Sequence, residues 1–241
     1  MSFMRLHGPQ PSRSNRVRSY GTRRVFLQTA IAAGLSAALG AAPPLRRAFA
    51  QSAVKIVALG DSLTAGYGLP ENDGFVPRLQ AALTANGAAA SVANAGVSGD
   101  TASDGLARLD WSVPVGTDAV TIELGANDML RGIKPEVTRS ALEAILQRLT
   151  ARHIAVLLCG MRAAPNLGAE YGAAFERIYP ELAAKYGALL YPFFLDRVAA
   201  DLKLTQPDGL HPNAAGVEVI VTRILPKVEE LMTRARALRP S

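Results

Sequence analysis

The chain has 241 residues, of which 49% are hydrophobic, and a formal net charge of +6 at pH 7. This length suits one α/β domain preceded by a targeting segment, and the apolar content argues against general disorder. The positive charge belongs to residues 1–50, which hold eight arginines and no acidic residue. The rest of the chain holds 18 basic and 20 acidic residues, a net charge of −2. Because this part has no basic excess for binding phosphates, we expect no nucleic-acid partner.

The first 50 residues have the features of a twin-arginine signal peptide. Arg23 and Arg24 open the segment RRVFL, and an Ala/Gly/Leu-rich stretch follows up to residue 42. The sequence AFA at 48–50 then predicts cleavage before Gln51. We expect the twin-arginine translocase and signal peptidase to deliver one mature domain, residues 51–241, to the periplasm or the medium. An uncleaved anchor stays open, because the apolar stretch approaches the roughly 20 residues of a membrane span.

After residue 51, short apolar runs alternate with longer amphipathic stretches. The apolar runs predict strands at Lys55–Leu59, Ser91–Ala95, Ala119–Leu124, Ala155–Cys159 and Leu189–Pro192. The amphipathic stretches predict helices at Phe75–Asn86, Ala102–Leu109, Pro135–Ala151, Tyr171–Tyr186 and Asn213–Arg236. This alternation indicates an α/β fold, a three-layer α/β/α sandwich with a central parallel sheet of about five strands, flavodoxin-like in type. In such sheets the functional groups gather beyond the carboxyl ends of the strands.

Ser62 follows the first predicted strand, in the segment GDSLT. A serine at a strand-to-helix turn presents its hydroxyl at the sheet edge, close to free backbone N–H groups. Alternatively, Asp61 and Ser62 serve only as a helix N-cap, and we expect Asp61 to fix the turn in either case. The chain has neither of the glycine-rich phosphate-binding patterns that often follow a first strand.

Two further strand ends carry candidate groups. Gly99 lies in NAGVSGDT after the second strand, where backbone N–H groups can closely approach a ligand. Asn127 lies in GAND after the third strand and offers a side-chain amide donor. Taken singly, each segment also fits an ordinary turn.

Asp208 and His211 lie three residues apart in DGLHP, between the last strand and the last helix. The carboxylate can hold one ring nitrogen while the other faces a serine. The only other histidine after the leader, His153, precedes the fourth strand at the opposite end, so His211 is the credible base. No second histidine or cysteine accompanies the pair, which argues against a metal site. Cys159, the only cysteine, ends an apolar run and is expected in the core.

These pieces occur in the order Ser, Gly, Asn, Asp-x-x-His. The order resembles the SGNH (GDSL) hydrolase family, whose four marker residues match Ser62, Gly99, Asn127 and His211. The segments GDSLTAGYG, NAGVSGDT, GLARL, ELGANDMLRG, AFERIYPELA, PFF and DGLHPN are similar to its bacterial periplasmic acyl-CoA thioesterase, arylesterase and lysophospholipase type. The resemblance covers residues 54–233. The chain departs from that type at Ala126, which replaces a glycine, and in the loop 162–171, which leaves substrate preference open.

The resemblance implies a serine esterase or thioesterase that acts on arylesters, acyl thioesters and lysophospholipids through an acyl-enzyme. Ser62, His211 and Asp208 would form the triad, and the N–H groups of Ser62 and Gly99 with the Asn127 amide would form the oxyanion hole. It implies no cofactor or metal, a small-molecule acyl substrate and a monomer. By the same resemblance, Met161–Tyr171 and Leu106–Leu109 border an acyl channel. The sequence offers Met161, Leu167 and Tyr171 as candidate walls of this channel. The alternative, that Met161–Tyr171 is a surface loop that never touches the substrate, stays open.

Three alternatives remain at this stage. A carbohydrate O-deacetylase would prefer acetylated glycans to longer acyl esters. An inactive SGNH-fold binding module would resist covalent labelling by a fluorophosphonate. A flavodoxin-like flavin or nucleotide binder would carry a yellow colour or a bound nucleotide when purified.

Overall fold

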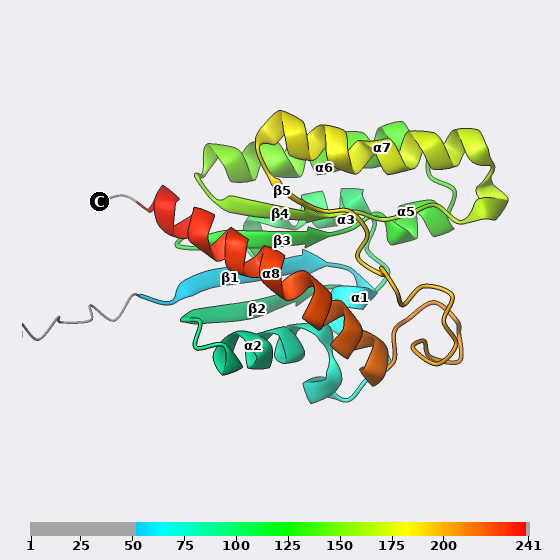
Figure 1. Cartoon of the computed structure of the whole chain (residues 1–241). Helices are drawn as coiled ribbons and strands as arrows, with labels where there is room; N and C mark the ends of the chain where they lie inside the picture. Colours follow the sequence, from blue (N-terminus) through cyan, green and yellow to red (C-terminus); the bar gives the residue numbers. More distant parts are fainter. Residues whose placement is uncertain (1–51, 240–241) are drawn as a thin grey trace, which may run out of the picture. The chain divides into compact units, whose positions relative to one another are not determined.

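The computed structural model describes residues 52–239, so the predicted signal peptide lies outside the described residues. The centre of the fold is a sheet of five parallel strands in the order β2-β1-β3-β4-β5 (Figure 1). The strands are β1 Val54–Gly60, β2 Ala90–Gly96, β3 Ala119–Glu123, β4 Ala155–Cys159 and β5 Leu189–Tyr191. All five predicted strands and the predicted three-layer α/β/α architecture are confirmed.

Helices cover both faces of the sheet (Figure 1). One face carries α2 Phe75–Ala85 and α8 Ala214–Leu238, which pack against each other. The other carries α3 Ala102–Ala107, α6 Pro135–Ala151 and α7 Ala169–Tyr186. The remaining helices are short: α1 Ser62–Ala65, α4 Leu109–Ser112, α5 Ala126–Leu130 and the 3₁₀ turns η1 Glu71–Asp73 and η2 Pro165–Leu167. Within residues 52–239, no helix combines the length and apolar character needed to cross a membrane.

The apolar runs become strands because both faces of the sheet are covered. Every residue of β3 and β4 is buried, so these strands read as continuous apolar segments rather than alternating ones. The predicted helix at Ala102–Leu109 is interrupted. The break falls at Arg108, whose guanidinium donates to the carbonyls of Ala95 and Gly60 at the ends of β2 and β1.

The strand order reverses at β1, because β2 lies on one side of it and β3 on the other. The connection from β1 to β2 passes over one face of the sheet through α2, whereas the connections from β2 to β3 and from β3 to β4 pass over the other face through α3 and α6. The loops that follow β1 and β3 therefore diverge at this point. The segments after β1, β2 and β3 carry Ser62, Gly99 and Asn127, respectively. The fold thus gathers three of the predicted site residues at its topological switch point.

Candidate active site

Ser62 is the first residue of α1, directly beyond β1. Asp61 is the N-cap of this short helix, since its Oδ1 accepts the Leu63 N–H at 3.0 Å. The first turn of a helix leaves its N–H groups without intrahelical acceptors, so the Ser62 N–H is available to a ligand. The end of β1 is closely packed against α1. A Cβ at Gly60 would lie 2.0 Å from Thr64 Oγ1, so a larger residue there would displace α1.

His211 joins Ser62 to Asp208. Its Nε2 lies 2.9 Å from Ser62 Oγ, and its Nδ1 lies 2.6 Å from Asp208 Oδ2. The other oxygen of Asp208 accepts the backbone N–H groups of Leu210 and His211, at 2.9 and 3.0 Å. The structure therefore brings the three predicted residues into one continuous chain of hydrogen bonds.

The hydrogen bond from the His211 ring, together with the backbone N–H groups of Leu210 and His211, lowers the pKa of Asp208 to about 2. Asp208 is consequently a carboxylate at neutral pH, although its side chain is 38% exposed. Because a carboxylate only accepts hydrogen bonds, the imidazole proton resides on Nδ1. Nε2 is then free to accept the Ser62 hydroxyl proton.

Two residues that the sequence did not indicate hold the histidine loop in place. Gln206 donates its backbone N–H to the His211 carbonyl at 2.7 Å and its side-chain amide to the Tyr67 carbonyl at 2.8 Å. The Tyr67 ring lies against the imidazole, with the ring centroids 4.7 Å apart. Tyr67 precedes Gln206 by 139 residues, so no local pattern signals this contact.

Asn127 lies in α5 beyond β3 and reaches toward both neighbouring loops. Its Nδ2 lies 3.1 Å from Asp61 Oδ2 and 3.0 Å from the Asp100 carbonyl. The next residue, Asp128, is fully buried and anchors α5, because its carboxylate accepts the Ala102 N–H and the Thr138 hydroxyl, both at 2.8 Å. The Asn127 amide thus connects the segments that follow β1 and β2.

Gly99 lies in the loop between β2 and α3 with a φ of 90°. A Cβ there would meet only Arg131 Nη2, at 3.7 Å, so the left-handed backbone rather than lack of space requires glycine. The Arg131 guanidinium donates to the Gly99 carbonyl at 2.6 Å. Gly99 makes no hydrogen bond to Ser62 or His211; it is connected to Asn127 through the carbonyl of the next residue, Asp100.

A buried acid beneath this edge was missed by the sequence reading. Glu123 ends β3 and is 2% exposed, and its Oε2 accepts the Thr64 hydroxyl at 2.9 Å. The position of an acidic residue within the mostly apolar run AVTIEL could have indicated that Glu123 is buried. Asp61, expected only to fix the turn, also proves to be fully buried.

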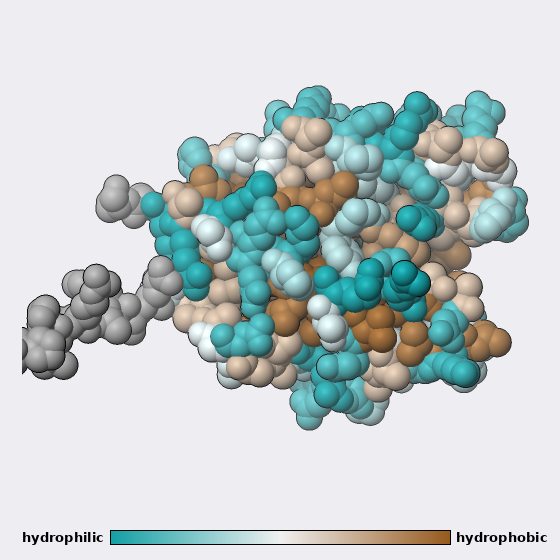
Figure 2. All heavy atoms as spheres, viewed as in Figure 1, coloured by the Kyte–Doolittle hydropathy of each residue, from teal (hydrophilic) through white to brown (hydrophobic). Residues whose placement is uncertain are grey.

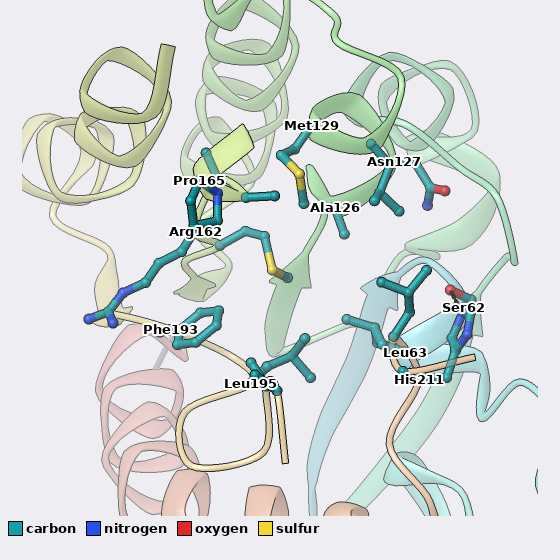
Figure 3. A pocket seen from close by; sticks show the side chains of 18 residues that line it. Ser62, Leu63, Ala126, Asn127, Met129, Arg162, Pro165, Phe193, Leu195 and His211 are labelled. Atoms are coloured by element: carbon teal, nitrogen blue, oxygen red, sulfur yellow. Dashed lines mark hydrogen bonds between the residues drawn. The ribbon is translucent and has the colours of Figure 1, made fainter. Parts of the chain in front are cut away.

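A cavity of about 340 Å³ opens beside Ser62 and His211 (Figure 3). Apart from Ser62, Asn127, Arg162 and His211, its lining is apolar. The apolar lining consists of Leu63, Ala126, Met129, Leu130, Met161, Ala163, Ala164, Pro165, Phe193, Leu195, Ala199, Ala200, Gly209 and Leu210. Figure 3 shows the Arg162 side chain extending away from Ser62, and its guanidinium lies 4.9 Å from the centre of the Phe193 ring. Ala126, where the resemblance expects glycine, contributes its methyl group to the wall.

Part of the predicted acyl wall is wrong. Met161 lines the cavity, but Leu167 and Tyr171 do not. In this segment the lining ends at Pro165, the first residue of the 3₁₀ turn η2, and none of α7 contributes to it. The Tyr171 hydroxyl instead donates to the Ile133 carbonyl at 2.8 Å. The segment Leu106–Leu109 is also absent from the lining, since Leu109 is buried in the core and Leu106 packs against it.

His153 and Cys159, the other residues considered for catalysis, do not line this cavity. His153 is exposed between α6 and β4, at the other end of the sheet, as expected. Cys159 is buried at the end of β4, and burial raises the pKa of its thiol well above the usual value. Leu210, which lines the cavity, is 51% exposed, and Leu202 in the segment before α8 is 82% exposed. Figure 2 shows hydrophobic residues at the surface between hydrophilic ones on the face that it draws.

Comparison with known proteins identifies the family. A model of the GDSL-like lipase/acylhydrolase family matches residues 58–219. Esterase TesA of Pseudomonas aeruginosa is 37% identical over 182 residues, which span 75% of this chain and 90% of that protein. The thioesterase 1/protease 1/lysophospholipase L1 of Escherichia coli K12 is 39% identical over 165 residues, or 68% of this chain and 78% of that protein.

A solved structure agrees with these matches. AlinE4, an SGNH-hydrolase family esterase, is 46% identical with a TM-score of 0.63, and the match covers 74% of this chain and 96% of AlinE4. The family model spans more than half of the chain, and the relatives share more than a third of the aligned residues. The chain therefore belongs to the GDSL-like lipase/acylhydrolase family and is a hydrolase that acts on ester bonds.

Proposed function

We propose that the protein hydrolyses small acyl esters and thioesters, with Ser62 as nucleophile, His211 as general base and Asp208 as the acid that orients His211. The observation that carries this proposal is the chain of hydrogen bonds from Ser62 Oγ through the imidazole to Asp208, with lengths of 2.9 and 2.6 Å. This is the arrangement that activates a serine hydroxyl, which is a weak nucleophile by itself.

The reaction proceeds in two half-reactions. Ser62 Oγ bonds to the substrate carbonyl carbon as its proton passes to His211 Nε2, and Asp208 stabilises the imidazolium. The tetrahedral intermediate then collapses, the carbon–oxygen or carbon–sulfur bond breaks, and the leaving group takes the proton from His211. A water molecule attacks the acyl-enzyme with His211 again as base, which releases the carboxylic acid and restores the Ser62 hydroxyl.

The negative charge on the carbonyl oxygen is held by the backbone N–H groups of Ser62 and Gly99 and by the Asn127 amide. Support comes from the position of these groups on the segments after β1, β2 and β3, which the rigid sheet holds in place. In the substrate-free structure the Asn127 amide donates to Asp61 and to the Asp100 carbonyl. One of these acceptors is therefore exchanged for the oxyanion during the reaction.

The acyl chain of the substrate occupies the apolar cavity beside Ser62. A volume of about 340 Å³ lies in the range of small-ligand pockets. Its hydrocarbon lining favours acyl chains over the hydroxyl-rich surface of a carbohydrate, so the O-deacetylase alternative has less support. The names of the relatives, an esterase and a thioesterase/lysophospholipase, agree with acyl esters and thioesters as the substrate class.

Export of the mature domain is the second part of the proposal. It is supported by the sequence alone, through the RRVFL segment and the AFA site before Gln51. We place the active protein, residues 51–241, in the periplasm or the medium after transport by the twin-arginine route and removal of residues 1–50.

A fluorophosphonate probe tests the assignment of the nucleophile. The mature protein is labelled, digested and analysed by mass spectrometry. We expect one adduct, on Ser62, with loss of ester hydrolysis in proportion to labelling. A protein that hydrolyses esters while its adduct lies on another residue would refute the assignment. A folded protein with neither label nor activity would be an inactive binding module.

A further inference from the structure

Two buried carboxyl groups lie side by side directly behind Ser62. Asp61 and Glu123 are 0% and 2% exposed, and Glu123 is paired in register with Gly60, the residue before Asp61. The Glu123 Oε2 atom lies 3.4 Å from the Asp61 backbone N. Within residues 52–239, neither carboxyl group takes part in a salt bridge. Two adjacent carboxylates without a cation are unfavourable in a low-dielectric interior, so the pair retains one proton.

The hydrogen bonds indicate which group is the carboxylate. Both oxygens of Asp61 accept N–H groups: Oδ1 from Leu63 at 3.0 Å and Oδ2 from Asn127 at 3.1 Å. Burial raises the pKa of Asp61 to about 6, and these donors oppose the rise because they stabilise the charged form, so Asp61 is a carboxylate at neutral pH. The Oε1 atom of Glu123, in contrast, is buried and has no donor among the described residues. Burial raises the pKa of Glu123 well above its usual value, and the charge of Asp61 raises it further. The proton therefore resides on Glu123.

We infer that Asp61, kept anionic by a protonated Glu123 behind it, is a positioning residue that aims the Asn127 amide at the oxyanion. This inference rests on the proposed role of Asn127. The amide has two N–H groups, and one donates to a charged carboxylate while the other donates to the neutral Asp100 carbonyl. A hydrogen bond to a charged acceptor is the stronger of the two. The bond to Asp61 thus persists, and the oxyanion displaces the Asp100 carbonyl.

The positioning of Asn127 and the capping of α1 can be tested separately, because each uses a different oxygen of Asp61. Oδ1 caps α1, whereas Oδ2 holds Asn127. Asp61→Asn keeps an oxygen for the Leu63 N–H but turns an NH₂ group toward the Asn127 amide, so one donor faces another. Asp61→Ser is a second variant, because serine is a good N-cap that is too short to reach Asn127. Both substitutions remove the positioning contact and leave the cap.

A double-mutant cycle in the mature protein tests the inference. kcat and KM for a short p-nitrophenyl ester are measured in wild type, Asp61→Asn, Asn127→Ala and the double variant, with folding checked by circular dichroism. We expect Asp61→Asn to lower kcat about 10–10²-fold with KM within about twofold of wild type. The double variant should be within about threefold of Asn127→Ala, because both changes remove one interaction. Asp61→Ser replaces Asp61→Asn if the latter does not fold.

A comparison of two substitutions at Glu123 tests the role of its proton. Glu123→Gln keeps a donor toward Asp61 and an acceptor for Thr64, whereas Glu123→Leu keeps neither. We expect kcat of the glutamine variant to be at least about tenfold higher than that of the leucine variant. Equal kcat values in the two variants would overturn the assignment of the proton to Glu123.

Other outcomes contradict the inference in distinguishable ways. Losses that multiply in the double variant would show that Asp61 acts independently of Asn127. A change confined to KM, or wild-type kcat in Asp61→Asn, would overturn the positioning role while leaving the proposed function intact. Wild-type kcat in Asn127→Ala would instead refute the proposed oxyanion hole itself, and the inference with it.

Discussion

Ser62 Oγ and His211 Nε2 lie 2.9 Å apart, although 149 residues separate them in the chain. Ser62 is placed by β1 and α1, and His211 by the loop that Gln206 closes before α8. The contact is thus a product of the sheet topology, which gathers the loops beyond the carboxyl ends of the strands.

Asn127→Ala should lower kcat by about 10²–10³-fold with little change in KM. The physical reason is that its amide donor acts mainly on the charge that develops in the transition state. Steady-state kinetics with a p-nitrophenyl ester measure the effect. If only KM rises, Asn127 binds the ground state of the substrate and not the oxyanion.

Leu195→Ala should flatten the dependence of kcat/KM on acyl length. Leu195 lines the cavity beside Ser62. Each methylene buried there contributes roughly 0.8 kcal/mol, or about a threefold to fourfold rise in kcat/KM. The slope from acetyl to octanoyl esters is compared with that of Leu167→Ala, a control of the same chemistry whose side chain lies outside the lining. Equal slopes in both variants and wild type would show that the acyl chain does not occupy this cavity.

Glu123→Gln should stabilise the protein increasingly as the pH rises. Burial raises the pKa of Glu123 in the folded state. A carboxyl group with a raised folded pKa makes its full contribution to stability below its unfolded pKa of about 4.3, and that contribution is lost as the pH rises toward the folded pKa. Glutamine does not titrate. From about pH 4 upward, the free energy of unfolding of the variant should therefore gain on wild type by up to about 1.4 kcal/mol per pH unit.

Urea unfolding between pH 4 and pH 8 measures this difference. Glu176→Gln, on an exposed position of α7, is the matched control and should show no such trend. A free energy of unfolding of Glu123→Gln that does not gain on that of wild type as the pH rises would contradict a protonated Glu123.

Replacement of Arg23 and Arg24 by lysine should leave precursor in the cytoplasm. The twin-arginine pair is the feature that the export route recognises, and lysine keeps the charge without it. Cell fractionation locates the protein, and N-terminal sequencing of the wild type should begin at Gln51. An intact leader on membrane-bound wild-type protein would favour an uncleaved anchor.

Local sequence patterns predicted the fold and most residues of the candidate site. The strands were recognisable because a sheet covered on both faces requires continuous apolar runs, such as AVTIEL and AVLLC. Ser62 and Asn127 could be placed because each lies within a few residues of the end of a strand. Asp208 and His211 could be paired because they are three residues apart, within one loop.

Contacts between distant segments could not be predicted in this way. The bond from Asn127 to Asp61 joins residues 66 positions apart, and nothing in either local segment indicates it. Leu167 failed as a wall residue because its direction depends on the η2 turn, which Pro165 and Gly168 make hard to foresee. The leader remains a prediction from sequence, since residues 1–50 lie outside the described part of the chain.

The most direct test of the central claim is kcat of mature Ser62→Ala on a short p-nitrophenyl ester, measured free of host esterases. Ser103→Ala, an exposed serine of α3, is the matched control and should retain wild-type kcat. Removal of the nucleophile from a serine triad typically lowers kcat by about 10⁴-fold or more, and we predict a loss of this size with the fold intact. Near-normal activity in folded Ser62→Ala would contradict the account.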